Sequence, residues 1–344
     1  MKPKLPLVSF EVPMSCNLNC LFCYNHYKGG GERPAPSSYS DARKALKMIF
    51  KRFDVGQITF TGGEPFMGER FSELVLTARM HGAKVGIISN GNYAAPENYL
   101  QLTKLGVSLF ELPIHSHDPK VHDLMTRREG AHSKSLTVIK TLLTNGVMPV
   151  AVIVLTKYNA DQAADTVRFI SNLGIKRMML NRYNIGGAGV GNPAEILPSE
   201  EQLIKAYREV SDEALAQGLT ILSSVCTPVC ILNPKDYRGI QFSGCTTDLT
   251  KRAVTIDYNG NLRFCNHSPV VLGNIFRNTV EEIFNSPALS EWRDTVPEFC
   301  EGCNDFATCK GGCRAASQQC GKSLDTPDPI IFCYGKFPKV SHKL

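Results

Sequence analysis

The sequence lacks the long apolar run that a membrane-spanning helix needs. No stretch of its 344 residues approaches the length of about 18 consecutive apolar residues that marks such a helix. The N-terminus also lacks the apolar core of a signal peptide, because the segment that follows Met1–Pro6 is too short. We therefore expect a cytoplasmic protein without a membrane partner.

Dense clusters of one charge are also missing. The net charge is +6, and no basic run is longer than two or three residues. A nucleic-acid interface normally gathers Lys and Arg on one face or stripe. The mild, evenly spread charge therefore argues against a nucleic-acid partner, while it remains compatible with acidic substrates.

Cysteine, in contrast, is abundant and unevenly distributed. The chain has 13 cysteines, an odd number that cannot form a closed set of disulfides. In a reducing cytosol such residues indicate metal binding. Ten of them follow residue 220, namely Cys226, Cys230, Cys245, Cys265, Cys300, Cys303, Cys309, Cys313, Cys320 and Cys333.

The other three cysteines form a CxxxCxxC run at Cys16, Cys20 and Cys23, directly after an apolar stretch. Three thiolates can bind three irons of a [4Fe–4S] cluster, whereas a site made by protein alone would have a fourth cysteine. The remaining iron would then be free to bind another molecule. A zinc knuckle or three buried core thiols are the alternatives.

This spacing resembles the signature of the radical S-adenosylmethionine (SAM) enzymes. The resemblance implies that SAM binds the open iron through its amino and carboxylate groups. It also implies that the reduced cluster cleaves SAM to a 5′-deoxyadenosyl radical, which is chemistry that the cofactor carries and the protein confines. An external reductant such as flavodoxin or ferredoxin would then be a partner.

Strand and helix patterns alternate six times between residues 7 and 217, which predicts parallel βα units and an α/β fold. Six units suit a partial (β/α)6 TIM-type barrel, as in the radical SAM core, although a doubly wound sheet fits the rhythm almost as well. The cysteine run after the first strand favours the barrel. The expected strands are 7–12, 57–60, 84–89, 108–114, 147–155 and 177–181, and the expected helices are 40–53, 71–81, 96–105, 133–145, 161–173 and 199–217.

The loops after the strands of such a barrel carry its chemistry. After the second strand, Gly62 and Gly63 let the backbone approach a ligand, and Glu64 can accept a hydrogen bond from an ammonium group. With Pro65 they resemble the family's GGEP motif, which implies contact with the SAM methionine amine. Ser89, after the third strand, is expected to touch SAM, and an ordinary turn is the alternative at both places.

Other loops offer further candidates. After the fourth strand we expect a loop in which Ser116 or Arg127 contacts SAM, with Arg127 pairing with its carboxylate. We interpret His122–Asp123 in the same loop as a local structural pair. Tyr24 is expected near the adenine, and the glycine-rich loop 181–189 either contacts a ligand or faces solvent.

The C-terminal cysteines have a specific spacing. Cys300-x2-Cys303-x5-Cys309-x3-Cys313 follows Gly260-x4-Cys265, and the Asn-Gly at 259–260 predicts a hairpin. This pattern resembles the SPASM domain, an extension of radical SAM enzymes with two auxiliary [4Fe–4S] clusters, and covers about residues 240–334. We expect a radical SAM core over 1–220 and a SPASM domain over 221–344. Zinc ribbons are the alternative.

The SPASM resemblance implies two ligand sets. The first auxiliary cluster would take Cys245, Cys265 and Cys313, and we choose Cys230 as its fourth ligand. Cys226 is the rival, or the position is open, and Cys226 and Cys320 are otherwise spare. The second cluster would take four cysteines, namely Cys300, Cys303, Cys309 and Cys333.

The resemblance implies an oxidoreductase that modifies a ribosomally made peptide or protein side chain, by crosslinking or dehydrogenation. Only 15 residues precede Cys16, so we expect either a separate leader-peptide-binding protein or a small-molecule substrate. A sulfatase-type maturase, a tetrapyrrole side-chain decarboxylase and a sugar or nucleoside enzyme are the enzymatic alternatives. A non-catalytic electron carrier is the non-enzymatic alternative, although the motifs at Glu64 and Ser89 would then have no function.

Overall fold

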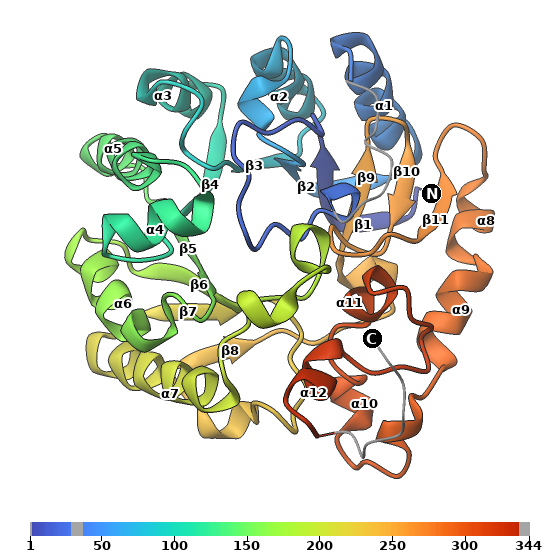
Figure 1. The fold of residues 1–344 in the computed structure, drawn as a ribbon. Helices are drawn as coiled ribbons and strands as arrows, with labels where there is room; N and C mark the ends of the chain where they lie inside the picture. The colour runs from blue at the N-terminus through green and yellow to red at the C-terminus, as the bar shows by residue number, and fades with distance from the viewer. Residues whose placement is uncertain (1, 29–36, 337–344) are drawn as a thin grey trace.

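Eight consecutive parallel strands form the wall of the protein, arranged in a ring with α1–α7 on its outside (Figure 1). The computed structural model describes residues 2–28 and 37–336. Each strand pairs with the next in chain order. The strands are β1 (Lys4–Glu11), β2 (Asp54–Thr61), β3 (Lys84–Ile88), β4 (Val107–Pro113), β5 (Val150–Leu155), β6 (Arg177–Arg182), β7 (Thr220–Ser223) and β8 (Ile240–Phe242).

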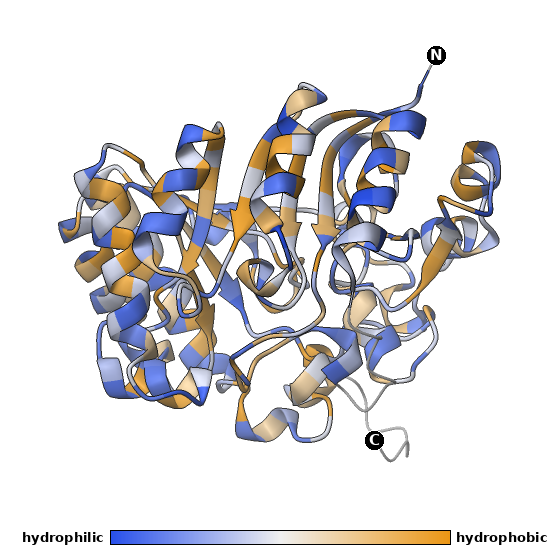
Figure 2. Cartoon of the chain, turned by 90° about the horizontal axis from the view of Figure 1, so that it is seen from above, coloured by the Kyte–Doolittle hydropathy of each residue, from blue (hydrophilic) through white to orange (hydrophobic). Residues whose placement is uncertain are grey.

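The helices between these strands turn an apolar face to the sheet. In α1 the buried residues are Ala42, Ala45, Leu46, Ile49 and Phe50, a spacing that places them on one helix face. Figure 2 shows strands that are largely hydrophobic and outer helices that carry both kinds of residue. The helices are α1 (Tyr39–Arg52), α2 (Phe71–Met80), α3 (Pro96–Lys104), α4 (Pro119–Thr126), α5 (Ala131–Thr144), α6 (Ala163–Asn172) and α7 (Glu200–Gln217).

The predicted α/β class and all six predicted strand–helix units are confirmed. Two features differ from the prediction. The segment expected as a loop after β4 contains α4, which begins at Pro119 after the capping residue Asp118, whose side chain accepts a hydrogen bond from the Lys120 backbone. In addition, β7 and β8 extend the parallel sheet beyond the sixth unit.

The C-terminal part joins the same sheet on its other side. The strand β9 (Ala253–Asp257) pairs in parallel with β1, and it continues into the antiparallel strands β10 (Asn261–Arg263) and β11 (Val271–Asn274). The predicted hairpin is confirmed, and Gly260 in its turn has a φ of 82°. The helices that follow are α8 (Val280–Phe284), α9 (Pro287–Asp294), α10 (Phe306–Cys309), α11 (Arg314–Gln319) and α12 (Pro329–Cys333).

The predicted domain boundary at residue 220 falls where β7 begins, and one continuous sheet of eleven strands runs through both predicted parts. Among residues 2–28 and 37–336, no helix has the length and apolar content to cross a membrane.

Two buried ion pairs connect the C-terminal part to the parallel strands. Glu11 at the end of β1 pairs with Arg263 of β10, and Arg182 at the end of β6 pairs with Asp328 before α12. All four side chains are at least 98% buried. Burial raises the pKa of Glu11, and the Arg263 guanidinium opposes this change. Because a buried charge is costly without its partner, each pair requires the two parts to lie together.

We expect Arg263→Met to lower the free energy of unfolding by about 3–5 kcal/mol, because it leaves the Glu11 carboxylate buried without a partner. The double variant Glu11→Leu/Arg263→Met should recover much of this loss, since neither charge remains. Urea denaturation measures both effects.

The matched control is Arg168→Met, because the side chain of Arg168 is half exposed and pairs with Asp165 and Glu213 at the protein surface. Exposed pairs contribute little, so this variant should unfold at nearly the same urea concentration as the wild type. Equal losses for Arg263→Met and Arg168→Met would refute the role of the buried pair.

Candidate active site

The loop after β1 brings Cys16, Cys20 and Cys23 together. Burial raises the pKa of Cys20, and the neighbouring thiols of Cys23 and Cys16 raise it further. The backbone N–H of Leu18 donates to the Cys16 sulfur at 3.4 Å. Three partly buried thiols near one another fit a three-thiolate iron–sulfur site, where the positive irons would stabilise the thiolates.

In the part of the chain that the structure describes, no group of three or more His, Cys, Asp or Glu side chains is arranged to hold one metal ion.

The two glycines after β2 lie against the chain that enters the cysteine loop. Gly63 N–H donates to the Pro13 carbonyl at 2.6 Å, and Glu64 N–H donates to the Ser15 carbonyl at 2.9 Å. A Cβ atom on Gly63 would lie 1.9 Å from the Ser15 oxygen, and Gly62 has a φ of 120°. Glycine is thus required here for close backbone contact with the cysteine loop, in addition to the predicted approach to a ligand.

Glu64 is fully buried and connects two loops. Its carboxylate accepts hydrogen bonds from Ser89 Oγ at 2.8 Å, from Asn90 N–H at 2.7 Å and from Phe66 N–H at 3.3 Å. Ser89 also forms a hydrogen bond of 2.7 Å with the Tyr99 hydroxyl. Glu64 and Ser89, both predicted to touch SAM, therefore bind each other, and their contact with SAM stays a prediction.

The charge state of Glu64 reflects two opposing influences. Burial raises the pKa of Glu64 to about 7, while the hydrogen bonds from Asn90 and Ser89 oppose the change. Desolvation disfavours the charged form of a carboxyl group, and donors favour it. Burial is the larger effect here.

Asn90 is the residue that joins the loop after β3 to the cysteine loop. Its Nδ2 donates to Asn17 Oδ1 at 2.9 Å and to the Cys16 sulfur at 3.6 Å. The candidate named from the sequence in this loop was Ser89 and not Asn90. The contact with Cys16 is made by the loops after β1 and β3, which lie on either side of β2 in the sheet, and the local sequence does not show that these loops meet.

The two candidates after β4 lie in different surroundings. Ser116 is buried, donates to Gln162 Oε1 at 3.2 Å and accepts from Asp118 N–H at 2.9 Å, so its hydroxyl orders the start of α4. Arg127 is exposed at the end of α4 with a φ of 53°. Two residues earlier, the Met125 carbonyl accepts from Leu21 N–H at 2.9 Å. Arg127 therefore lies two residues after the hydrogen bond that joins α4 to the cysteine loop.

The His122–Asp123 pair is structural, as predicted. The Asp123 carboxylate accepts from Gly130 N–H at 2.6 Å and His132 N–H at 2.8 Å, at the start of α5. His122 Nδ1 accepts from the His115 N–H at 3.1 Å.

Tyr24 lies against the C-terminal part of the chain. Its ring stacks on His267 with centroids 4.1 Å apart and an angle of 16°. Asn266 donates to its hydroxyl at 2.7 Å, and Gln319 donates to its carbonyl at 3.0 Å. The predicted position of Tyr24 near the adenine is untested, and sequence analysis missed its contact with His267.

The first C-terminal thiol group contains Cys226. Cys226 donates a hydrogen bond to Cys245, which raises the pKa of Cys226, together with burial and the nearby thiols of Cys313 and Cys265. The same hydrogen bond lowers the pKa of Cys245 to about 5, and the Arg252 guanidinium adds to this effect. Sequence analysis chose Cys230 for this group and kept Cys226 as the rival. The structure instead places Cys226 beside Cys245, near Cys265 and Cys313.

The second thiol group contains Cys230. Burial raises the pKa of Cys300 to about 11, and Cys309, Cys303 and Cys230 raise it further. The chain turns shortly after Cys226, at residues 228–231, where the Pro228 carbonyl accepts from Ile231 N–H at 2.9 Å. Cys230 lies within this turn, and Val229 N–H donates to the Cys309 sulfur at 3.4 Å, so the turn brings Cys230 to the second group.

Cys333 was predicted to belong to the second group. Burial raises the pKa of Cys333, and Asp328 raises it further. Burial, Asp328 and Cys333 raise the pKa of Cys320 to about 11. Cys333 thus lies near Asp328 and Cys320, and its place in the second group stays a prediction.

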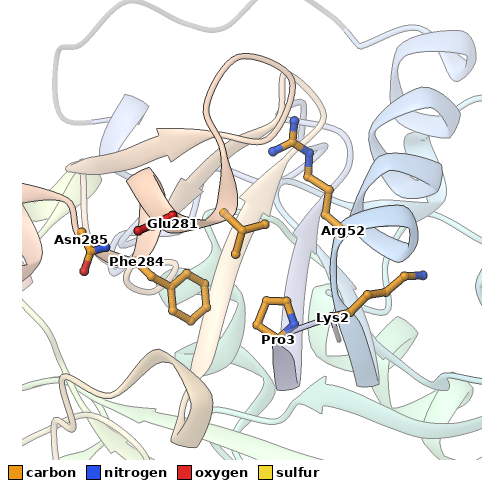
Figure 3. Close-up of a pocket in the computed structure, with 7 residues that line it drawn as sticks. Lys2, Pro3, Arg52, Glu281, Phe284 and Asn285 are labelled. Carbon is orange, nitrogen blue, oxygen red and sulfur yellow. The ribbon is translucent and has the colours of Figure 1, made fainter.

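A shallow hollow of about 780 Å³ lies far from these cysteines (Figure 3). It includes Lys2 and Pro3 before β1, Arg52 at the end of α1, and Phe284 of α8. The cysteine loop follows the opposite end of β1. The hollow is therefore separate from the candidate active site.

Comparisons with known sequences agree with the cysteine patterns. The sequence model of the Radical SAM superfamily matches residues 11–170, and that of the SPASM iron–sulfur cluster-binding domain matches residues 245–304. A PqqA peptide cyclase of Xanthomonas campestris pv. campestris is 25% identical over 330 residues, which cover 94% of this chain and 85% of that protein.

Solved structures show the same fold. The structure of Streptococcus suis SuiB bound to S-adenosylmethionine has a TM-score of 0.71 and 18% identity, and covers 95% of this chain and 77% of that one. Native anSMEcpe with bound AdoMet has a TM-score of 0.73 and 18% identity, and covers 96% of both chains.

The raised pKa of Glu64 predicts a pH-dependent stability of the cluster-free protein. Between its ordinary pKa of 4.5 and its folded value of about 7, the folded state binds a proton that the unfolded state releases. The contribution of Glu64 to the free energy of unfolding should therefore be largest below the lower value. It should fall by roughly 3 kcal/mol as pH rises through this window.

Glu64→Gln, which stays neutral, should remove this pH dependence. The check is urea denaturation of both proteins at about pH 5 and about pH 7.5, two values that span most of the range between the unfolded and folded pKa values of Glu64. Because other groups titrate equally in both proteins, the difference between them isolates Glu64. Parallel stability profiles would contradict the expected protonation.

Proposed function

This chain is an enzyme of the radical SAM superfamily with a SPASM iron–sulfur domain, and from this premise we propose that it oxidatively modifies a peptide. The substrate is a ribosomally made peptide or protein, and the product contains a crosslink or a dehydrogenated side chain. The observation that carries this proposal is the likeness to PqqA peptide cyclases over 94% of the chain, which includes both the barrel and the cysteine-rich part.

Cys16, Cys20 and Cys23 hold the cluster that binds SAM. When bound, this cluster and SAM supply a 5′-deoxyadenosyl radical that abstracts a hydrogen atom from the substrate. The protein holds the three thiols in a loop that hydrogen bonds fix to β2 and β3. Such fixed positions and the exclusion of water favour reaction with the substrate over side reactions.

The residues around this loop form the SAM site. The backbone of Gly62, Gly63 and Pro65 lines it, while buried Glu64 and Ser89 hold the loops after β2 and β3 in place. Ser116 orders the start of α4 in the same way.

Two further side chains complete the SAM site in this proposal. Arg127 is exposed near the cysteine loop, and it suits the SAM carboxylate, because a guanidinium binds carboxylates with two parallel hydrogen bonds. Tyr24 forms part of the wall between the SAM site and the C-terminal part, since its ring stacks on His267.

The C-terminal thiol groups hold two auxiliary [4Fe–4S] clusters. The first has Cys245, Cys265, Cys313 and, in place of our sequence-based choice, Cys226. The hydrogen bond between Cys226 and Cys245 supports this assignment. The second has four ligands as well, namely Cys230, Cys300, Cys303 and Cys309, and Cys333 is the rival of Cys230.

One partner follows from the chemistry. Reductive cleavage of SAM consumes an electron, so an external reductant such as flavodoxin or ferredoxin is needed. A separate protein that binds the leader peptide is a second partner that we propose only for a peptide substrate with such a leader. We place the enzyme in the cytoplasm, because its cysteines form no disulfides in the structure and a reducing compartment keeps cysteines available as metal ligands.

Anaerobically reconstituted protein should bind about twelve irons, from three clusters of four. With dithionite it should cleave SAM to 5′-deoxyadenosine, and co-expression with candidate precursor peptides should give a product that has lost two hydrogen atoms. Iron analysis, chromatography and mass spectrometry measure these outcomes.

The control replaces Cys16, Cys20 and Cys23 together by Ala. About eight irons should remain, and SAM cleavage should stop. Stoichiometric zinc without iron would contradict the cluster assignment. SAM cleavage without any change in the peptide would instead favour a small-molecule substrate.

The auxiliary ligands have their own test. Cys226→Ala and Cys230→Ala should each alter the electron paramagnetic resonance spectrum of a different auxiliary cluster, because ligand identity and solvent exposure set cluster properties. SAM cleavage should be largely kept in both variants. Cys320→Ala is the control and should resemble the wild type.

Changes to the same cluster in Cys226→Ala and Cys230→Ala would refute the division of the two cysteines. If Cys333→Ala damages the second cluster and Cys230→Ala does not, the rival is the ligand.

A further inference from the structure

Asn184, in the loop after β6, donates toward a thiol of the first C-terminal group. Its side chain is 4% exposed. The Nδ2 atom lies 3.3 Å from the Cys313 sulfur and 2.6 Å from Nδ1 of His267. The two N–H bonds of one amide group therefore have two acceptors, a sulfur and a ring nitrogen.

Buried charges fix the orientation of this amide. Arg182 Nη1 donates to Asn184 Oδ1 at 3.5 Å, so the oxygen faces the guanidinium and the nitrogen faces Cys313. Arg182 also donates to the Cys226 carbonyl at 2.7 Å and pairs with Asp328. The Asp328 carboxylate in turn accepts from Cys313 N–H at 2.8 Å. The same network thus holds the donor amide and the thiol that accepts from it.

His267 fixes the other side of Asn184. Because the Asn184 nitrogen can only donate, His267 Nδ1 accepts, and its ring proton is on Nε2. The ring is held by its stacking on Tyr24, and the His267 carbonyl accepts from Gln319 Nε2 at 2.6 Å. Gln319 also accepts from Gly187 N–H at 2.6 Å, three residues after Asn184.

We propose that Asn184 is a positioning residue that raises the reduction potential of the first auxiliary cluster through an N–H···S hydrogen bond to Cys313. This inference rests on the proposed ligand set of that cluster. Reduction adds negative charge, part of which lies on the sulfur atoms. An N–H dipole aimed at a sulfur stabilises this charge, and hydrogen bonds to the sulfurs are among the features that set cluster potentials.

The test is an anaerobic redox titration of the fully loaded enzyme, followed by electron paramagnetic resonance. The signal of the first auxiliary cluster is identified as the one altered in Cys226→Ala. In Asn184→Ala the midpoint potential of this cluster should shift to a more negative value. Asn184→Asp keeps the shape but replaces the donor with a carboxylate, so its shift should have the same direction and be larger.

The matched control is Asn192→Ala. Asn192 lies in the same loop, is exposed, and makes no side-chain capping hydrogen bond. This variant should leave all midpoint potentials unchanged, and the SAM-binding cluster should keep its potential in every variant.

Several outcomes overturn the inference. One is an unchanged potential in both Asn184 variants with a full iron content. Another is loss of about four irons from Asn184→Asp, since Asn184 would then be needed to hold the cluster rather than to set its potential. A wild-type enzyme that lacks the first auxiliary cluster would refute the proposed ligand set as well, so the two failures can be told apart.

Discussion

The structure depends on the position of β1 between β2 and β9. All three strands are parallel, and Glu11 at the end of β1 lies opposite Thr61 on one side and Asp257 on the other. The chain leaves β1 directly into the cysteine loop, so the first thiols are placed where the barrel and the C-terminal hairpin meet. The buried pair of Glu11 with Arg263 fixes this meeting point. Desolvation makes the pair costly to form. For the same reason, an arrangement that separates Glu11 from Arg263 and leaves either charge buried alone would be strongly destabilised.

A second buried pair has the same role at the other side of the site. Arg182 at the end of β6 and Asp328 before α12 connect the barrel to the loop that carries Cys313. Arg182 also donates to the Cys226 carbonyl. Two of the four thiols in the first C-terminal group therefore take their position from the end of a barrel strand. The first C-terminal thiol group is built on the barrel as much as on the C-terminal part, and the pairing of β9 with β1 joins the same two parts in one sheet.

Local sequence predicted the features that depend on local chemistry. The six strand–helix units follow from apolar periodicity, and the hairpin follows from Asn-Gly, because Gly260 takes a positive φ. The helix α4 was not predicted although Asp118 and Pro119 form a capping signal. The histidines of that segment favoured its interpretation as a ligand-binding loop. The partners of Cys226 and Cys230 could not be predicted from spacing. Their separation depends on a turn at Pro228 and on the packing of segments far apart in the chain.

Hydrogen bonds join the loops around the first three thiols. Gly63 and Glu64 bind the backbone before Cys16, Asn90 binds Asn17, and Leu21 binds the end of α4. The positions of the thiols are therefore set by hydrogen bonds between four loops. Burial, however, raises the pKa of Cys20 and of Cys16, so the same packing opposes the thiolate form. In the proposed function, Cys16, Cys20 and Cys23 would hold the cluster, and its irons would supply the positive charge that stabilises the thiolates. The packing that positions the thiols is thus also the reason that their charged form would depend on the irons.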